Sequence, residues 1–259
     1  MSVLSQQEIR TVLTEGRQAY LAVDTRHGPH VTPELYGVID DSLGMWVATS
    51  TLKAKVLRES RAVGVLVRTA AGAVVMSGTG EVLDPLRPPL NPARLLGAGR
   101  LTVNFTLRNV PDLVAFGRDT LAGATGFPPA RRVLIVIRPE HASTVDAFAN
   151  DVVVGLRTPV GPLAVPGRWL GDDRVELPAE MADLAGTTDG PVSVTADEYV
   201  GPGPAAKRGV LLRGEGRLVE EDDRLVLSVQ PIRRTEWRGV HISTEPVAQP
   251  VPGRPRPPA

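Results

Sequence analysis

The stretch AYLAVDTRHGPHVTPELYGVIDDSLGMWVAT, residues 19–49, reappears in outline as VVVGLRTPVGPLAVPGRWLGDDRVEL at residues 152–177. The two stretches share, in the same order, Gly28-Pro29 with Gly161-Pro162, Pro33 with Pro166, Tyr36 with Trp169, and Asp40-Asp41 with Asp172-Asp173. Two later segments continue the match: residues 75–80 with residues 211–216, and the apolar run ending at Pro139 with the one ending at Pro231. Landmarks that keep their order indicate a duplicated domain. Because the loops have diverged, we expect a pseudo-dimer with one working site.

Many short apolar runs separated by Gly and Pro turns indicate a mainly β fold with short helices. In the first copy we expect strands at residues 19–24, 30–40, 45–48, 62–67, 73–83 and 132–139. This pattern favours a barrel over a doubly wound sheet. We predict two tandem barrels, residues 1–148 and 149–246, that pack about a pseudo-two-fold axis. Residues 247–259 are rich in proline and are expected to form a disordered tail.

Local signals predict a few helices. Ser5 and Glu8 have the spacing of a capping box, and Gly16 is expected to end that helix in a left-handed conformation. Thr51 is expected to cap a helix that runs to Ser60, and Asn109 to cap a longer amphipathic helix. The proline-rich residues 84–92 are expected to be irregular.

Composition limits the possible functions. The formal net charge of the 259 residues is zero, which gives no reason to expect a nucleic-acid partner. The chain has no cysteine, which excludes disulfides and thiolate chemistry. It has neither a signal-peptide pattern nor an apolar run of the roughly 20 residues that a membrane span needs. We expect a cytoplasmic protein without a membrane partner, and the abundance of Arg, Ala, Gly, Val and Pro suggests a bacterial source.

The run from Tyr20 to Val67 resembles the flavin-binding split-barrel proteins related to pyridoxamine 5'-phosphate oxidase. The pieces that carry the resemblance are Leu21–Val23, Gly28, His30-Val31-Thr32-Pro33, Asp40-Asp41, Met45-Trp46-Val47 and Thr49-Ser50-Thr51-Leu52-Lys53. The resemblance covers nearly all of the first half, and the second half only through the repeat. It implies that the barrels are split barrels in a homodimer-like pair, with FMN or a related deazaflavin held between them.

The residues themselves support a phosphate site. Thr49, Ser50 and Thr51 place hydroxyl and N–H donors at a predicted helix N-terminus, and Lys53 adds a cation one turn in. Lys55 is interpreted as a surface charge. The matching segment of the second copy, residues 178–183, contains Glu180 and Asp183 but no lysine, so we expect that copy to have lost its cofactor.

The resemblance also implies ring-side residues. Thr32 and Pro33 would flank the flavin ring, and His30 would either donate to it or be an ordinary half-exposed strand histidine. Arg233 and Trp237 would reach the site from the second barrel, across the pseudo-two-fold axis. Lys207 and Arg208 could meet a phosphate from the same side, and Trp46 lies on a neighbouring strand and could equally be core.

Three functions remain open at this stage. The first is an FMN-dependent oxidoreductase that acts on an unidentified small molecule, in which the protein supplies little side-chain chemistry and no catalytic residue can be named. The second is a reductase of the same fold that uses an 8-hydroxy-5-deazaflavin coenzyme, with Lys55, Arg58 and Arg61 on its acidic tail. The third is a non-catalytic flavin- or haem-binding module, although the possible haem ligands His141 and His241 have no distinctive setting. The chain would act as a monomeric pseudo-dimer or pair further as a homodimer.

Overall fold

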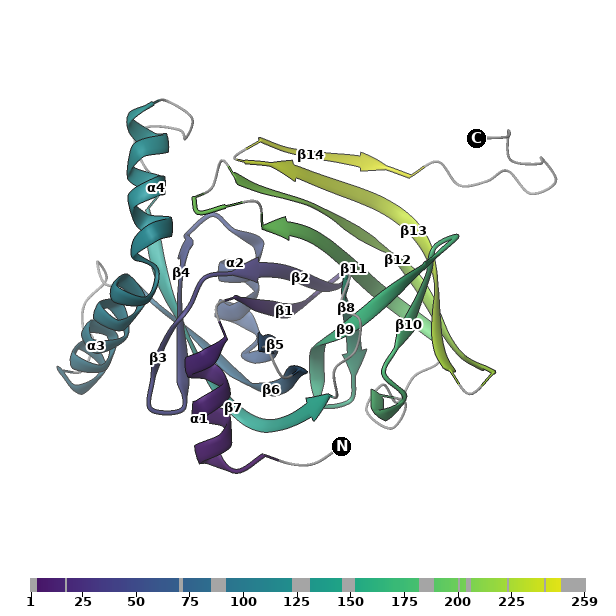
Figure 1. Ribbon diagram of the computed structural model, residues 1–259, viewed down its shortest axis with the longest axis horizontal. Helices are drawn as coiled ribbons and strands as arrows, with labels where there is room; N and C mark the ends of the chain where they lie inside the picture. Colours follow the sequence, from purple (N-terminus) through teal and green to yellow (C-terminus); the bar gives the residue numbers. More distant parts are fainter. Residues whose placement is uncertain are drawn as a thin grey trace.

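A computed structural model gives the architecture of the chain (Figure 1). It describes residues 4–16, 18–69, 72–84, 92–122, 131–145, 152–181, 189–199, 201–203, 206–222, 224–239 and 241–247. Residues 248–259 of the predicted tail lie outside the described residues. Two antiparallel sheets of seven strands each account for most of the chain.

The first sheet has the strand order β2-β1-β5-β6-β7-β4-β3. Its strands are β1 (Ala19–Thr25), β2 (Gly28–Glu34), β3 (Gly37–Ile39), β4 (Ser42–Ala48), β5 (Ala62–Thr69), β6 (Gly72–Leu83) and β7 (Arg132–Val145). The predicted strand 30–40 is therefore two strands, because the chain leaves the ladder at Leu35 and Tyr36. β2 and β3, consecutive in the chain, occupy the two ends of the strand order, as expected for a split barrel.

The second sheet repeats this topology. Its strands are β8 (Val152–Thr158), β9 (Gly161–Gly171), β10 (Arg174–Leu177), β11 (Asp189–Tyr199), β12 (Lys207–Glu221), β13 (Arg224–Arg238) and β14 (His241–Pro246). The order is β10-β9-β8-β11-β12-β13-β14, and β10 also pairs with β13. Thus β8, β11, β12, β13 and β10 take the places of β1, β5, β6, β7 and β4, while the continuous β9 replaces β2 and β3. The chain consists of two tandem split barrels that form an intramolecular pseudo-dimer.

The matched segments 75–80 and 211–216 each contain a Gly-x-Gly sequence, Gly78-Thr79-Gly80 and Gly214-Glu215-Gly216, which lies inside β6 or β12. The ladder register shifts between Ser77 and Gly78 in β6, and between Arg213 and Gly214 in β12. A Cβ atom on Gly78 would lie 2.2 Å from the backbone oxygen of Arg138. The glycines therefore permit equivalent bulges in the two barrels and form no nucleotide loop.

The helices confirm some of the local predictions. α1 (Gln6–Glu15) begins with the capping box of Ser5 and Glu8, and α2 (Leu52–Glu59) starts at Thr51. The prediction for Gly16 was wrong: its φ of −64° and ψ of 146° are extended, so the chain passes directly towards β1.

Two predicted caps were also wrong. The Thr51 hydroxyl donates to the backbone oxygen of Ala48 over 2.8 Å and makes no cap hydrogen bond. Asn109 precedes α4 (Val110–Leu121), but its side chain donates to the backbone oxygens of Tyr36 and Phe105. In both places the side chain donates to a backbone carbonyl outside the helix that it precedes, and does not accept from an N–H of the first turn.

One helix was not predicted at all. α3 (Pro92–Arg108) follows the proline-rich segment, and together with α4 it forms an insertion between β6 and β7. The Asn104 side chain of α3 accepts a 2.7 Å hydrogen bond from the backbone N–H of Val38, which covers the edge strand β3. The second barrel joins β12 to β13 directly, without such helices.

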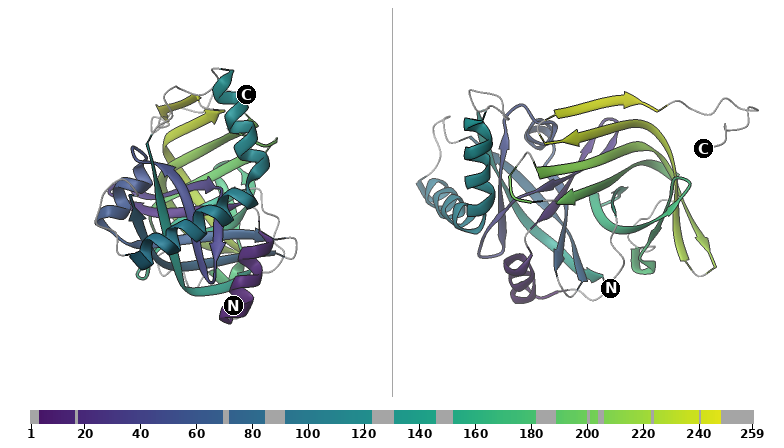
Figure 2. Two further views of the ribbon diagram at one scale, coloured as in Figure 1. Left: turned by 90° about the vertical axis from the view of Figure 1, so that its left-hand side faces the viewer. Right: turned by 45° about the horizontal axis from the view of Figure 1, so that its top comes forward.

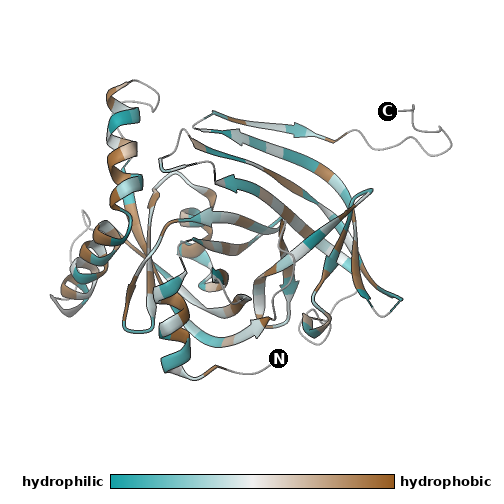
Figure 3. Cartoon of the chain, viewed as in Figure 1, coloured by the Kyte–Doolittle hydropathy of each residue, from teal (hydrophilic) through white to brown (hydrophobic). Residues whose placement is uncertain are grey.

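The two barrels lie side by side, with α3 and α4 at the outer end of the first (Figures 1 and 2). The long strands β11 to β14 arch over β2 and α2 (Figure 1). Apolar positions recur along the strands of both barrels (Figure 3). One buried cluster includes Tyr20, Val31 and Leu66 from the first barrel together with Val154 and Val194 from the second. The barrels therefore share a core, and their interface is a fixed part of the fold.

Candidate functional site

The edge strand β2 of the first barrel lies against the second barrel. Thr195 of β11 donates its hydroxyl to the backbone oxygen of Val31 over 2.9 Å. Because side chains alternate along a strand, His30, Thr32 and Glu34 project from the same side of β2. All three are half-buried. The strand therefore presents a short row of polar groups at the boundary between the barrels.

Lys53 of α2 reaches this row. Its side chain is buried, and its Nζ donates to the Thr32 hydroxyl over 3.0 Å and forms an ion pair with Glu34. Burial, with Lys207 nearby, lowers the pKa of Lys53 to about 7 despite the carboxylate. An ammonium group in this position gains from any further negative charge that reaches it.

A second cation comes from the other barrel. Lys207 is the first residue of β12, and burial lowers the pKa of its ammonium group. Asp112 of α4 and Asp197 of β11 oppose this shift, while Arg132 of β7 adds to it. Burial also lowers the pKa of Arg132. Basic groups from both barrels thus converge on one region that is poorly solvated.

His30 lies beside the same group of cations. Burial, Lys53 and Arg213 of β12 together lower the pKa of His30 to about 3, which leaves the imidazole neutral near pH 7. Its Nδ1 atom and the Nε atom of Arg213 are buried and have no hydrogen-bond partner in the described part of the chain. Two polar atoms are therefore available for a ligand at this boundary.

A pocket of about 360 Å³ opens at the end of β2 between the barrels. Its apolar wall consists of Leu35, Trp46, Phe105, Leu113 and Phe116, and its polar lining includes Glu34, Asp112, Arg132 and Lys207. The guanidinium carbon of Arg132 lies 5.0 Å from the ring centroid of Phe116. The indole N–H of Trp46 is buried and unpaired among the described residues. The pocket combines an apolar, partly aromatic wall with two acidic and two basic side chains, and α3 and α4 of the insertion supply part of the wall.

The predicted hydroxyl residues have other partners. Thr49 donates its hydroxyl to the backbone oxygen of Arg131 over 2.6 Å, and Thr51 to that of Ala48. The backbone N–H groups of Thr49 and Thr51 bond to the same two oxygens. Ser50 is exposed. The structure therefore brings Thr32 and Lys53 together, but it directs the donors of Thr49 and Thr51 to the backbone. Pro33 is half-buried in β2.

The two residues predicted from the second barrel, Arg233 and Trp237, lie on β13. Arg233 is exposed and stands opposite Arg213 in the ladder, where its charge lowers the pKa of Arg213 further. Trp237 is half-buried and lies over Gly209, because a Cβ on that glycine would be 2.2 Å from the indole ring. Both are on β13, which pairs with β12, the strand that carries Lys207 and Arg213.

Sequence reasoning missed Glu34. Its position two residues after Thr32 was the available signal, since alternation puts both side chains on one face of a strand. The pairing with Lys53 depends on how α2 packs beside β2, which no local pattern reports. Sequence reasoning also missed Asp112 and Phe116, which belong to the insertion.

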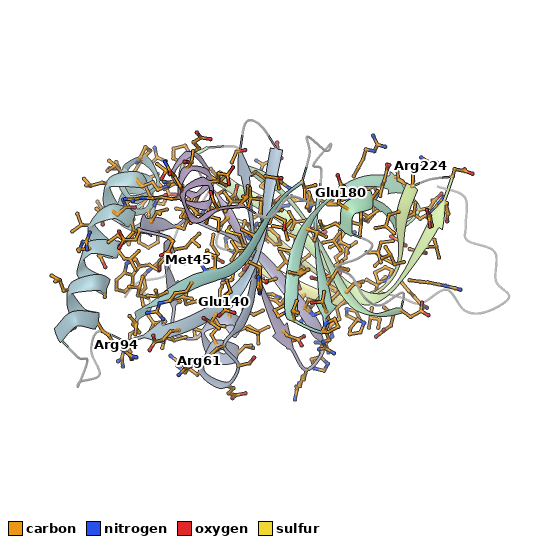
Figure 4. All side chains as sticks on the ribbon, turned by 90° about the horizontal axis from the view of Figure 1, so that it is seen from below. Met45, Arg61, Arg94, Glu140, Glu180 and Arg224 are labelled. Atoms are coloured by element: carbon orange, nitrogen blue, oxygen red, sulfur yellow. The ribbon has the colours of Figure 1, made fainter. Side chains whose placement is uncertain are left out.

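In the second copy, the described part of the matching segment, which ends at residue 181, contains the 3₁₀-helix η1 (Ala179–Met181), whose Met181 is fully buried. Glu180, labelled in Figure 4, is in this short turn. Asp183 lies outside the described residues. No group of three or more His, Cys, Asp or Glu side chains in the described ranges is placed to bind a metal ion, and no described helix is long and apolar enough to cross a membrane.

No protein-family model and no curated protein matches the chain. Solved structures resemble about half of it. A conserved hypothetical protein, Rv2991 from Mycobacterium tuberculosis, is 22% identical over 55% of this chain and 85% of its own, with a TM-score of 0.40. A putative pyridoxamine 5'-phosphate oxidase from Listeria innocua is 12% identical over 55% and 98%, with a TM-score of 0.36. An FAD-binding protein from Mesorhizobium loti is 22% identical over 54% and 94%, with a TM-score of 0.37. One of these structures belongs, by its name, to the pyridoxamine 5'-phosphate oxidase proteins that the sequence resembles. The similarity between these structures and this chain is a similarity of fold.

Proposed function

We propose that the chain binds FMN between its two barrels and acts as a flavin-dependent oxidoreductase on a small molecule. The observation that carries this proposal is the convergence of basic side chains from both barrels on one pocket with an aromatic wall. Arg132 of the first barrel and Lys207 of the second line the pocket, and Lys53 lies beside it, paired with the lining residue Glu34. The pocket volume is within the usual range for small-molecule sites, roughly 300–1,000 Å³.

The charges favour an anionic ligand. Lys53 is buried and Lys207 is half-buried, and burial together with the nearby Lys207 lowers the pKa of Lys53. A phosphate group near them would offset that repulsion and form charge-assisted hydrogen bonds, which are about twice as strong as neutral ones. Glu34 pairs with Lys53, and Asp112 and Asp197 act on Lys207, so a ligand phosphate would compete with these carboxylates for the two ammonium groups.

The walls favour a flat ring. Leu35, Phe105 and Phe116 offer apolar surface, and the unpaired Trp46 indole N–H is a donor at the pocket lining. FMN, when bound, would supply the electron-transfer chemistry, while these residues would bind and orient it. His30, neutral near pH 7, offers one more polar contact at the boundary of the barrels. An 8-hydroxy-5-deazaflavin coenzyme fits the same reasoning, with Arg213 and Arg233 available to a longer acidic tail.

Glu34 favours a second candidate function. Its carboxylate already neutralises Lys53, and it faces the pocket that the phosphate would enter. A protein in which this pair is permanent would keep the barrel fold as a non-catalytic binding module. Haem is the less favoured ligand of such a module, because His141 and His241 are both exposed on strands away from the pocket lining.

A titration with FMN, followed by flavin fluorescence, separates these functions. We expect binding by the wild type and at least tenfold weaker binding by Lys207→Met, since a charged hydrogen bond contributes about 1.5–3 kcal/mol. Lys55→Met is the matched control, because Lys55 is exposed on α2. Mass analysis of any ligand released from the purified protein distinguishes FMN from a deazaflavin. Absence of binding by the wild type to either cofactor would reject the proposal in favour of the non-catalytic module.

A further inference from the structure

The outer faces of α3 and α4 carry a row of exposed apolar side chains, which we call the helix stripe. It consists of Leu96, Val103, Leu107, Val110, Val114 and Leu121, each between 45% and 92% exposed. Within each helix the members are four or seven residues apart, which places the three of α3 on one side of that helix and the three of α4 on one side of theirs. Single exposed apolar residues need no explanation, but a continuous row of this length marks an interaction site.

The stripe runs across one face of the molecule. Seen from the outer end of the first barrel, α4 continues the band of α3 across that face (Figure 2, left). The other flanks of the helices are used internally: Leu101 and Phe105 of α3 and Ala115 of α4 are buried towards the barrel. The insertion therefore has two apolar sides, one packed on the core and the other on the surface.

The stripe is symmetric about the break between the helices at Asn109. Counting outwards from the midpoint of residues 108 and 109, Leu107 matches Val110, Val103 matches Val114, and Leu96 matches Leu121. The symmetry extends to the charged neighbours, since Arg100 is mirrored by Gly117 and Arg118 by Gly99. A Cβ added to Gly99 or Gly117 would meet no atom within 4 Å. Each of the two exposed arginines beside the stripe is thus matched by a glycine with free space at its Cβ position.

We propose that the helix stripe binds the same stripe of a second copy of this chain. A two-fold axis through the break at Asn109 would place α3 antiparallel to α4 of the partner subunit, and α4 against the partner's α3. Each apolar side chain then meets an apolar side chain, and each arginine meets a glycine that leaves room for it. Arg118 already has a carboxylate partner in Asp119 at 3.3 Å, which would reduce its repulsion of Arg100 of the partner subunit.

The area is just below that of a stable interface and fits a weak, transient dimer. The 17 residues of α3 and the 12 of α4 span about 25 Å and about 18 Å at 1.5 Å per residue. With a helix diameter of about 10–12 Å, the two faces give roughly 450 Å² per copy, or about 900 Å² in total. Specific interfaces begin near about 1,000 Å². We therefore expect a reversible dimer whose population depends on protein concentration.

Sedimentation velocity of the full chain, from about 1 µM to about 200 µM, tests the proposal. The wild type should shift from monomer to dimer with concentration. Val103→Glu should weaken association at least tenfold, because two uncompensated carboxylates would be buried in each dimer. Val114→Lys should do the same. The double variant Val103→Glu, Val114→Lys should restore the dimer, since residue 103 of one copy faces residue 114 of its partner.

The matched control is Val160→Glu, which changes a similarly exposed valine in the second barrel and should leave association unchanged. A wild type that stays monomeric over this range, or a dimer that survives Val103→Glu, overturns the proposal. Failure of the double variant to recover the dimer also overturns it. Cosedimentation of a monomeric wild type with vesicles of anionic phospholipid would instead identify the stripe as a membrane-binding surface.

Discussion

Replacement of Glu34 by glutamine tests the charge balance on which the cofactor site depends. Glu34 and a ligand phosphate would compete for the same ammonium group of Lys53. Two acceptor oxygens bound to one ammonium lie about 4–5 Å apart, given hydrogen bonds of about 2.9 Å. At an effective dielectric constant of about 20, two unit charges at that distance repel by roughly 3 kcal/mol. We expect Glu34→Gln to strengthen FMN binding by about 10- to 100-fold, since part of this repulsion is offset by solvent.

The same variant should destabilise the protein without ligand. Removal of one partner of a buried ion pair lowers the free energy of unfolding by about 3–5 kcal/mol. The decrease for Glu34→Gln should be smaller, because glutamine retains an oxygen that can accept a hydrogen bond from Lys53. Because the pKa of Lys53 is lowered to about 7, the loss should be smaller still at pH 8.5 than at pH 6.

Fluorescence titration with FMN and thermal unfolding at the two pH values measure both effects, and Glu59→Gln on the exposed end of α2 is the control. A folded Glu34→Gln protein that binds FMN no better than the wild type would refute the reasoning, because phosphate and Glu34 would then not share Lys53.

Two further predictions concern stability. The pKa of His30 is lowered to about 3, so the unfolded chain binds more protons than the folded one as the pH falls from about 6.5 to about 3. The free energy of unfolding should therefore fall over that pH range by at most ~5 kcal/mol. Urea unfolding of His30→Gln should lack this part of the pH dependence. An equal acid slope in variant and wild type would count against a buried neutral His30. Gly64→Ala should lower the free energy of unfolding by about 1–3 kcal/mol or more, because its Cβ would lie 2.3 Å from the backbone oxygen of Pro162 in the other barrel. Gly97→Ala, in open space on α3, should instead be neutral or stabilising by up to about 1 kcal/mol, and similar effects of the two substitutions would argue against the close contact of the barrels.

The repeat predicted the topology well, because turn residues and strand alternation are local signals that survive divergence of the sequence. Gly28 and Gly161 show this: both open the second strand of a barrel with a positive φ, 95° and 121°, that favours glycine. α3 was missed for a related reason. Its apolar residues face both core and solvent, so the segment lacks the one-sided pattern that identifies a surface helix.

The candidate site could be predicted only in part. Thr32 and Lys53 were named from the sequence and contact each other in the structure. The donors of Thr49 and Thr51 bond instead to the backbone oxygens of Arg131 and Ala48, contacts that depend on how α2 is joined to its neighbours. Glu34 and the insertion helices enter the site through tertiary packing, which composition and spacing do not encode.

The stoichiometry of cofactor binding tests the central claim most directly. A calorimetric titration of the full chain with FMN, on protein stripped of any ligand, counts the sites and needs no assumption about the substrate. One FMN per 259-residue chain is predicted, since Lys53 and α2 occur in the first barrel, while the matching segment of the second barrel, residues 178–183, contains no lysine. Two equal sites per chain, or no heat of binding at any FMN concentration up to about 1 mM, would contradict a single flavin site between the barrels.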